Sequence, residues 1–404
     1  MSHSHIINNE RRSTPNEVSK TAIENVRIFN GVDFETPSTV CLDGGYITNL
    51  DECSDAETTV DGTGKFLIPG LIDSHLHLSD VQSLEDFTSY GLTTAMHMNC
   101  GNYTQCKAME DLPGLANFVH AGRSAVGKNS SHEKTDPTRP KDTLIYPNTN
   151  AVQWTDWQFG NGSNFMKITA EVNGPSTEQQ VQIVEHTHSK YRAQTMTHAS
   201  AIMSYQQAVA SKTDGIQHLP DDGILDNTTI QAILAQGQFV TPTLNVFEYA
   251  YRTPALQQYF GVSAGSNRTL EHVETNVRLL YQAGVPLIAG TDSVGTLVQN
   301  GTSVSVPWGL TLHYEMENFV NIVGMSPAEA INAATREAAK WHRVPDRGSV
   351  AVGQRADVLM LNSNPLLNIT NTRDIAKAWA FGFEVASLAA ANSSDVNPGN
   401  LPEA

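Results

Sequence analysis

Histidine, lysine and aspartate side chains recur in this 404-residue sequence close to the ends of short apolar runs. The clearest case is the stretch 65–78, an apolar run that ends in His75-Leu76-His77. If residues 71–77 form a strand, side chains alternate between its two faces, so both imidazoles lie on one face, roughly 7 Å apart. Two ring nitrogens at the end of a strand can bind a metal ion together.

Four more positions repeat this pattern further along the chain. His198, His218 and Asp292 each end an apolar run, and Lys167 lies inside one. A buried ammonium group is costly, so Lys167 must be paired, neutral or chemically modified. A single histidine or aspartate at a strand end is more often a packing or turn residue. The functional interpretation therefore depends on the whole set, which is His75, His77, Lys167, His198, His218 and Asp292.

Strand-like and helix-like segments alternate between these positions. We expect strands at 71–77, 91–98, 165–169, 194–198, 215–218, 239–244 and 285–292. We expect helices at 84–90, 113–121, 177–191, 201–211, 227–236, 269–283 and 326–339. About eight such units predict an α/β fold with a (β/α)₈ TIM barrel, in which all strand ends face one mouth. The scattered ligand-type residues would meet there.

The two ends of the chain show short β-type runs without intervening helices. The N-terminal runs lie at 23–29, 38–42 and 46–50, and the C-terminal runs at 356–361, 376–380 and 384–388. We expect both ends to form one small β-sandwich domain. The predicted organisation is a flexible tail at 1–20, the sandwich at 21–66 plus 345–395, the barrel at 67–344, and a tail at 396–404.

Charge and hydropathy limit the partners of the protein. The net charge is −17 with only 25 lysines and arginines, which argues against nucleic acid or an acidic membrane surface. There is no apolar run of 18 residues, so we expect no membrane span. The partner we expect is a small-molecule amide or peptide, and we expect a homo-oligomer.

The sequence leaves the cellular compartment of the protein open. The N-terminus lacks the apolar region of a signal peptide, so we expect a cytoplasmic protein. Eight Asn-x-Ser/Thr sequons point the other way, and a removed leader would make the protein secreted.

Four cysteines without a CxxC motif are neither a disulfide scaffold nor a zinc site. We expect Cys41, Cys53, Cys100 and Cys106 to be small buried apolar residues.

Further motifs give the chain a resemblance to a known family. They are Leu-Ile-Pro-Gly-Leu-Ile-Asp-Ser-His-Leu-His at 67–77, Gly-Thr-Asp at 290–292, Ala-Thr-Arg-Glu-Ala-Ala-Lys at 334–340 and the stretch 346–362. With these motifs, residues 23–390 resemble the metal-dependent amidohydrolase superfamily. The six ligand-type residues resemble its binuclear branch, which includes prolidase-like and Xaa-amino-acid carboxypeptidase-like hydrolases and a fungal ochratoxin-cleaving amidase.

The resemblance implies a mechanism for the six residues. Lys167 would be carboxylated by CO₂, and its carbamate would bridge two metal ions, usually Zn²⁺. His75, His77 and Asp292 would hold one ion, and His198 and His218 the other. A hydroxide between the ions would attack an amide or peptide carbonyl, and Asp292 would carry the proton to the leaving nitrogen. Lys167 and Asp292 are thus the predicted catalytic residues.

Substrate contacts are less defined in the sequence. His97 stands where many relatives have an aspartate, and Ser200 where relatives in the Xaa-amino-acid branch often have a tyrosine that contacts the substrate. In the charged segment 132–141, His132, Lys134 or Arg139 is a candidate partner for a substrate carboxylate. A packing role for His97 and a solvated loop at 132–141 remain alternatives.

Three other functions remain alternatives. A lactonase or ester hydrolase would use the same centre, because the same hydroxide attacks either carbonyl. A mononuclear deaminase of this superfamily typically has an acidic residue three positions after the third metal-binding histidine, where this chain has Ala201. A non-catalytic scaffold would have lost ligands, whereas all six are present.

Overall fold

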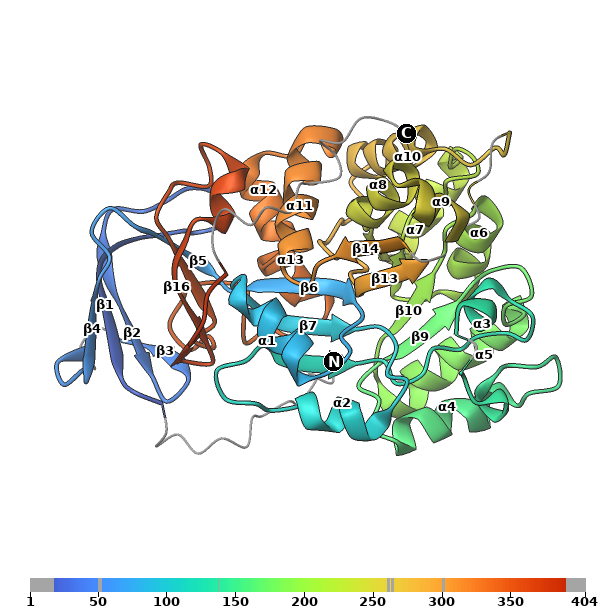
Figure 1. Cartoon of the computed structure of the whole chain (residues 1–404), viewed down its shortest axis with the longest axis horizontal. Helices are drawn as coiled ribbons and strands as arrows, with labels where there is room; N and C mark the ends of the chain where they lie inside the picture. The colour runs from blue at the N-terminus through green and yellow to red at the C-terminus, as the bar shows by residue number, and fades with distance from the viewer. Residues whose placement is uncertain are drawn as a thin grey trace.

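The computed structural model describes residues 18–49, 53–136, 138–259, 262, 265–299 and 302–389. The predicted tails lie outside these ranges, except for residues 18–20. In the described part of the chain, no helix is long and apolar enough to cross a membrane. Figure 1 shows a β-rich region at one end and a larger region of mixed helices and strands beside it.

Strands from both ends of the described chain pair in one sheet (Figure 1). The order is β17-β16-β15-β5-β1-β2-β3, with β4 beside β1. The central contact is antiparallel and places Met360 of β15 opposite Leu67 of β5. The strands are β1 (Thr21–Ile28), β2 (Ser38–Asp43), β3 (Tyr46–Thr48), β4 (Thr58–Asp61), β5 (Phe66–Pro69), β15 (Val358–Leu361), β16 (Ile375–Ala380) and β17 (Phe383–Glu384).

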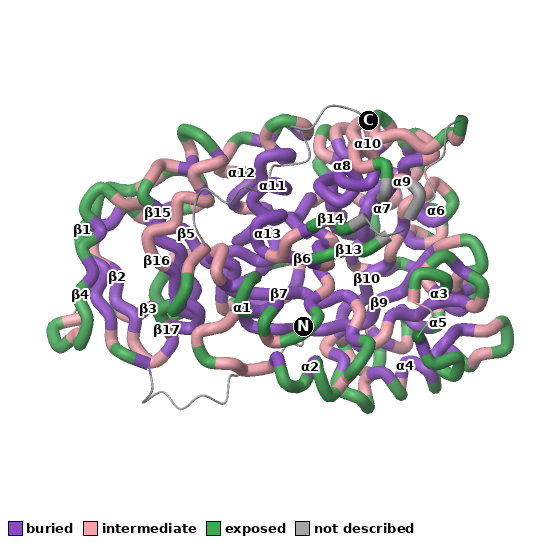
Figure 2. The backbone as a smooth tube through the Cα atoms, viewed as in Figure 1, coloured by how far each residue is buried: buried purple, intermediate pink, exposed green. Residues whose placement is uncertain are grey.

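Two groups of parallel strands occupy the larger region. The first is β6-β7-β8 and the second is β9-β10-β11-β12. These strands are buried along nearly their whole length (Figure 2), so the polar residues that they contain, such as Asp73 and Thr94, are buried together with the apolar ones. Their bounds are Leu71–Leu76, Leu92–His97, Asn117–His120, Met166–Thr169, Thr195–His198, Gly215–Gln217 and Phe239–Thr241.

Single parallel bridges connect the two groups. Ala125, just after β8, pairs with Ile168 of β9, and Leu287 pairs with Val240 of β12. Ser293 then pairs with Leu76 of β6, so backbone contacts run in a circuit from β6 through β12 and back. The prediction of a regular strand at 285–292 is wrong, because only one isolated bridge, at Leu287, forms there. Asp292 adopts a positive φ of 56°, which an extended strand does not allow.

Most predicted helices are present, and several begin at a capping residue. Asp80, Ser176 and Ser326 each form a capping box at the start of α1 (Val81–Ser89), α5 (Thr177–His186) and α12 (Pro327–Ala333). The other α-helices are α2 (Tyr103–Met109), α3 (Ser131–Thr135), α4 (Ala151–Gly160), α6 (Ile202–Ser211), α7 (Asn227–Gln236), α8 (Leu244–Arg252), α9 (Pro254–Tyr259), α10 (Leu270–Gln282), α11 (Leu310–Asn318) and α13 (Arg336–Trp341). A hairpin of β13 (Gly295–Gln299) and β14 (Thr302–Val306) precedes α11.

Two predicted helices differ from the structure. The segment 113–121 contains β8 instead, because a short buried apolar run has no periodicity that separates strand from helix. The helix predicted at 326–339 is divided into α12 and α13, because Thr335 leaves the helical region with φ −137°.

The expectation for the cysteines is also wrong. The structure joins Cys41 to Cys53 and Cys100 to Cys106 in disulfides, with Cα atoms 5.6 Å and 6.2 Å apart. Such Cα distances are those of ordinary disulfides. The folded chain brings each pair together although the sequence spacing shows no framework.

Candidate metal centre

The six ligand-type residues identified in the sequence come together in the structure. All of them line one cavity of about 640 Å³. They come from β6 and the residue after it, from β9 and β10, and from the segments that follow β11 and precede β13. The six residues are His75, His77, Lys167, His198, His218 and Asp292.

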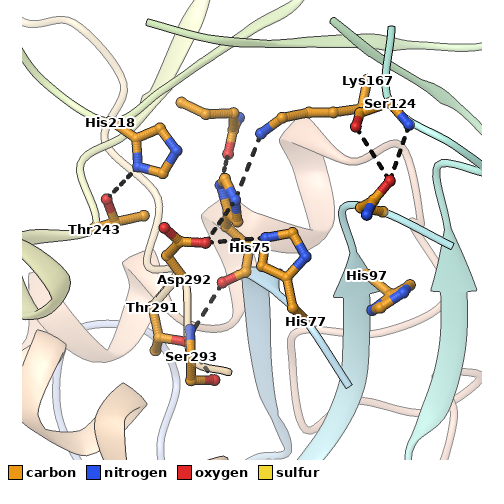
Figure 3. A network of polar contacts seen from close by, with 12 residues as sticks. His75, His77, His97, Ser124, Lys167, His218, Thr243, Thr291, Asp292 and Ser293 are labelled. Carbon is orange, nitrogen blue, oxygen red and sulfur yellow. Dashed lines mark hydrogen bonds and ion pairs between the residues drawn. The ribbon is translucent and has the colours of Figure 1, made fainter. Parts of the chain in front are cut away.

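His75, His77 and Asp292 form the tightest group (Figure 3). The Asp292 Oδ1 lies 3.3 Å from the His75 Nε2 and 3.0 Å from the His77 Nε2. One potential ligand atom from each residue lies within 4.8 Å of the others, so the group could hold a metal ion. The approach requires a glycine at position 290, because a Cβ there would lie 2.8 Å from the His75 backbone nitrogen.

Lys167 points at this group from β9 (Figure 3). Its side chain is 3% exposed, and its Nζ lies 3.5 Å from the His75 Nε2. Among the residues that the structure describes, no carboxylate forms an ion pair with it. Burial lowers the pKa of Lys167 to about 7, although Asp292 partly opposes the shift. The sequence left a paired, a neutral and a modified Lys167 open, and the structure places the amine in a buried position without an ion-pair partner among the described residues.

His198 and His218 extend the cluster on the other side of His75. The ring centres of His218 and His75 are 4.6 Å apart, and those of His218 and His198 are 4.5 Å apart. Burial lowers the pKa of both imidazoles well below the ordinary value, so they are neutral near pH 7, as metal-binding histidines must be.

Side chains outside the cluster orient its histidines. The Gln217 Oε1 lies 2.9 Å from the His75 Nδ1, and the Thr243 Oγ1 lies 2.8 Å from the His218 Nδ1. Such partners fix which ring nitrogen is free to bind a metal. His218, Thr243 and Asp292 all have positive φ angles of 52–73°, which costs energy in residues other than glycine. Three residues with strained backbone angles therefore lie at or next to the site.

The predicted substrate contacts divide into two groups. Ser200, His132 and Arg139 line the cavity, whereas His97 does not. The buried His97 accepts a hydrogen bond at its Nδ1 from the Leu78 backbone N–H, at 3.0 Å. This hydrogen bond supports the alternative in which His97 packs behind His77 and does not contact the substrate.

His132 forms a pair with a residue that the sequence did not single out. Its Nδ1 lies 2.9 Å from a carboxylate oxygen of Glu171, and its ring is 4.4 Å from that of His198. Burial would raise the pKa of Glu171, but the hydrogen bond from His132 holds it below the ordinary value. Glu171 follows β9 by two residues, so its position after a strand was a usable signal.

Arg139 differs from the other charged residues of the cavity. Its side chain is 4% exposed, its Nη2 donates a hydrogen bond to the Ser124 carbonyl, and its Nε forms no hydrogen bond. Burial lowers its pKa to about 10, and Asp136 partly offsets this effect. Among the described residues, no carboxylate lies within ion-pair distance of it.

Arg268 and Asp221 were missed by the sequence reasoning, although Asp221 follows β11 by four residues; Arg268 lies in a loop between α9 and α10. The Arg268 Nη2 lies 2.8 Å from the Asp221 Oδ2, and the Tyr251 hydroxyl donates to the same oxygen at 2.9 Å. This network also lines the cavity through Asp221 and Arg268, and its charges compensate each other.

The comparison with known families agrees with this site. Residues 66–387 match the model of the amidohydrolase family. The chain belongs to that family, and it is a hydrolase that acts on carbon–nitrogen bonds.

Individual relatives are distant. The chain is 22% identical to an N-acetylglucosamine-6-phosphate deacetylase of Lysinibacillus sphaericus over 388 residues, covering 86% of this chain and 95% of the relative. Among solved structures, a Xaa-Pro dipeptidase with bound methionine is similar with a TM-score of 0.76 and 18% identity, covering 91% of this chain and 99% of the other. The ochratoxinase of A. niger is similar with a TM-score of 0.74 and 17% identity, covering 92% and 96%. These likenesses show a shared fold.

Proposed function

We propose that the chain hydrolyses an amide or peptide bond with two zinc ions and a carboxylated Lys167. The observation that carries the proposal is the convergence of four imidazoles, one carboxylate and one buried amine on a single cavity. Nitrogen and oxygen ligands of this kind suit Zn²⁺. His75, His77 and Asp292 would hold one ion, and His198 and His218 the other.

The chemistry of Lys167 supports its proposed modification. A buried ammonium group without an acidic partner is unfavourable, and no such partner is found among the described residues. Reaction of the neutral amine with CO₂ forms an N–C bond and releases one proton, and it turns the amine into an anion. The resulting carboxylate oxygens would lie beyond the Nζ, which is already 3.5 Å from the His75 Nε2.

The bound metal would supply a hydroxide and polarise the scissile carbonyl. The chain's own residues would then orient the histidine rings and transfer protons. Asp292 lies at the mouth with its Oδ1 between His75 and His77, where it can take a proton from the attacking water and donate it to the leaving nitrogen. Gln217 and Thr243 keep the rings of His75 and His218 in place during turnover.

The circuit of parallel segments supports a closed (β/α)₈ barrel as the scaffold of this site. Seven parallel strands and the segment 287–293 follow one another in that circuit, and a barrel mouth collects strand ends in this way. We also propose that the sheet shared by the two chain ends belongs to a separate small β-sandwich domain. Domain boundaries at 66/67 and 344/345, a homo-oligomeric state and a cytoplasmic location stay predictions.

A substrate screen tests the function. The zinc-loaded protein, supplied with bicarbonate, should cleave members of a panel of N-acyl amino acids and dipeptides, and it should carry about two zinc ions per chain by elemental analysis. Removal of zinc by a chelator should abolish cleavage, and added Zn²⁺ should restore it.

Other outcomes of the same screen would contradict the proposal. Turnover of lactones alone would indicate an ester hydrolase, and release of ammonia from adenine would indicate a deaminase. A zinc content near zero after expression in zinc would indicate a non-catalytic scaffold.

A further inference from the structure

The cysteines and the asparagine sequons of this chain point to the same kind of cellular compartment. We propose that the protein folds in an oxidising secretory compartment and is N-glycosylated there at six asparagines. The inference does not depend on the proposed hydrolytic function, and it favours the secreted alternative over the cytoplasmic location expected from the N-terminus. The six sites are Asn102, Asn129, Asn161, Asn227, Asn267 and Asn368.

The first observation is the state of the cysteines. Cys41 is joined to Cys53 and Cys100 to Cys106, so all four cysteines of the sequence are paired. Each bond forms when two thiols lose two electrons and two protons to a thiol–disulfide oxidant. Secretory compartments supply such oxidants, whereas the glutathione and thioredoxin systems of the cytosol keep thiols reduced. Two disulfides with no thiol left over therefore indicate an oxidising compartment.

The second observation is the exposure of the sequons. A glycan is bulky and hydrated, so the asparagine that carries it must lie on the surface of the folded protein. All six sequon asparagines in the described part of the chain are exposed. Only eight of the 17 other described asparagines are exposed, and four are buried, so exposure is a property of the sequon set that asparagines in this fold do not share in general. Two further sequons, at Asn300 and Asn392, lie outside the described residues.

The side-chain amides of these asparagines can carry a substituent. The side-chain oxygens of Asn102 and Asn368 each accept a hydrogen bond at 3.1 Å from the backbone N–H of the threonine two positions later. The Nδ2 atoms of Asn161 and Asn267 each donate to a backbone carbonyl at 2.7 Å. An asparagine amide has two N–H groups, and a glycan replaces only one hydrogen. All four contacts can therefore persist in a glycosylated protein.

The attachment points leave the candidate metal centre free. None of the six asparagines lines its cavity, although Asn267 adjoins Arg268, which does. The sites are spread along the chain from the start of α2 to the segment after β15. Glycosylation is therefore compatible with the proposed hydrolysis and is not required for it.

The modification is a group transfer that needs a sugar donor. The donor class is an oligosaccharide attached to a lipid through a diphosphate. The bond between the sugar C1 and the diphosphate oxygen breaks, a bond from C1 to the asparagine Nδ2 forms, and the Nδ2 loses one proton. The lipid diphosphate is the leaving group, and the step involves no oxidation.

The test uses protein isolated from the cells that naturally produce it or from their medium. An N-glycosidase should lower its mass, and it converts each glycosylated asparagine to aspartate. Peptide mass spectrometry after digestion in heavy-oxygen water therefore identifies the sites. We expect all six, whereas Asn148, which is exposed but lies outside any sequon, should stay unmodified. The unfolded protein should show no free thiol until a reductant is added.

One site can be removed without changing its asparagine. Thr104→Ala destroys the sequon of Asn102 but leaves Asn102 in place as the N-cap of α2. Secreted from a fungal or animal cell, this variant should lose the glycan at Asn102 and keep the other five. Thr104→Ser is the matched control, because it preserves the sequon, and it should keep all six.

Several results would overturn the inference. Native protein whose mass an N-glycosidase leaves unchanged, or whose four cysteines all titrate as thiols without reductant, would show that it does not pass through such a compartment. An unmodified asparagine at one of the six positions would refute that site. Each of these results leaves the hydrolytic proposal in place, and failure of the substrate screen leaves the glycosylation sites in place.

Discussion

At the scale of single residues, the site contains a buried amine and strained backbone angles, both of which cost free energy. Lys167 is enclosed without an ion-pair partner in the described part of the chain, and His218 and Asp292 hold strained backbone angles. Strain and unpaired burial persist only where the surrounding structure enforces them, and they are concentrated at functional positions. The sequence identified all six residues of the cluster, because each stands in or after an apolar run.

Lys167→Ala should abolish amide hydrolysis, because the proposed carbamate bridge is lost. Short-chain carboxylic acids such as acetate or propionate should restore part of the activity by occupying the space of the deleted side chain. Elemental analysis should show less bound zinc in the variant. Lys340→Ala, on the exposed side of α13, is the control and should keep full activity. Full activity of Lys167→Ala without any added acid would contradict the bridging role.

At the scale of elements, helix α8 connects the site to the body of the protein. Its N-terminal residue Thr243 has a positive φ and provides no side-chain cap. The buried Glu315 of α11 accepts hydrogen bonds from the Leu244 and Asn245 N–H groups, each at 2.8 Å. Glu315 therefore caps α8 from another helix, and it supports Thr243 next to His218. No sequence pattern predicted α8, because its start depends on this distant carboxylate.

Glu315 gives stability a dependence on pH. Burial raises its folded-state pKa from 4.5 to about 8, so between these values the folded protein binds a proton that the unfolded chain has released. Stability should therefore fall as pH rises from about 4.5 to 8, by at most about 1.4 kcal/mol per pH unit from this group. Glu315→Gln should flatten the fall in melting temperature over this range.

The difference between variant and wild type isolates the contribution of Glu315 from that of other buried acids. Glu85→Gln removes the same charge from an exposed position of α1 and controls for net charge. A pH slope in Glu315→Gln equal to that of the wild type would show that the carboxyl group does not titrate in this window.

At the scale of the whole molecule, two disulfides constrain the chain. Cys41–Cys53 connects β2 to the segment before β4, and Cys100–Cys106 connects the segment after β7 to α2. The second disulfide lies next to Asn99, whose side-chain oxygen accepts from the Ser124 backbone N–H at 3.1 Å. The sequence did not predict these bonds, because a separation of 12 or 6 residues says nothing about distance in the fold.

Reduction of the disulfides should destabilise the folded protein. Each closed loop is short, so the expected loss is about 2–3 kcal/mol per disulfide. The melting temperature should fall in a reducing buffer, as measured by calorimetry. Variants with serine at Cys41 and Cys53, or at Cys100 and Cys106, separate the two contributions. A melting temperature that is the same with and without reductant would mean that neither bond forms in solution.

The sequence by itself determined the residue types and much of the element order. The buried parallel strands contain enough apolar residues, as in Leu71–Leu76 and Leu92–His97, that most of them could be recognised together with the ligand-type residues near their ends. The tertiary structure decided what depends on contacts between distant segments. It determined that 117–120 form strand β8, that Asp292 leaves the extended conformation and that the four cysteines pair. It also buried Arg139 without an ion-pair partner among the described residues. These features arise from distances between residues far apart in the chain, which local patterns do not contain.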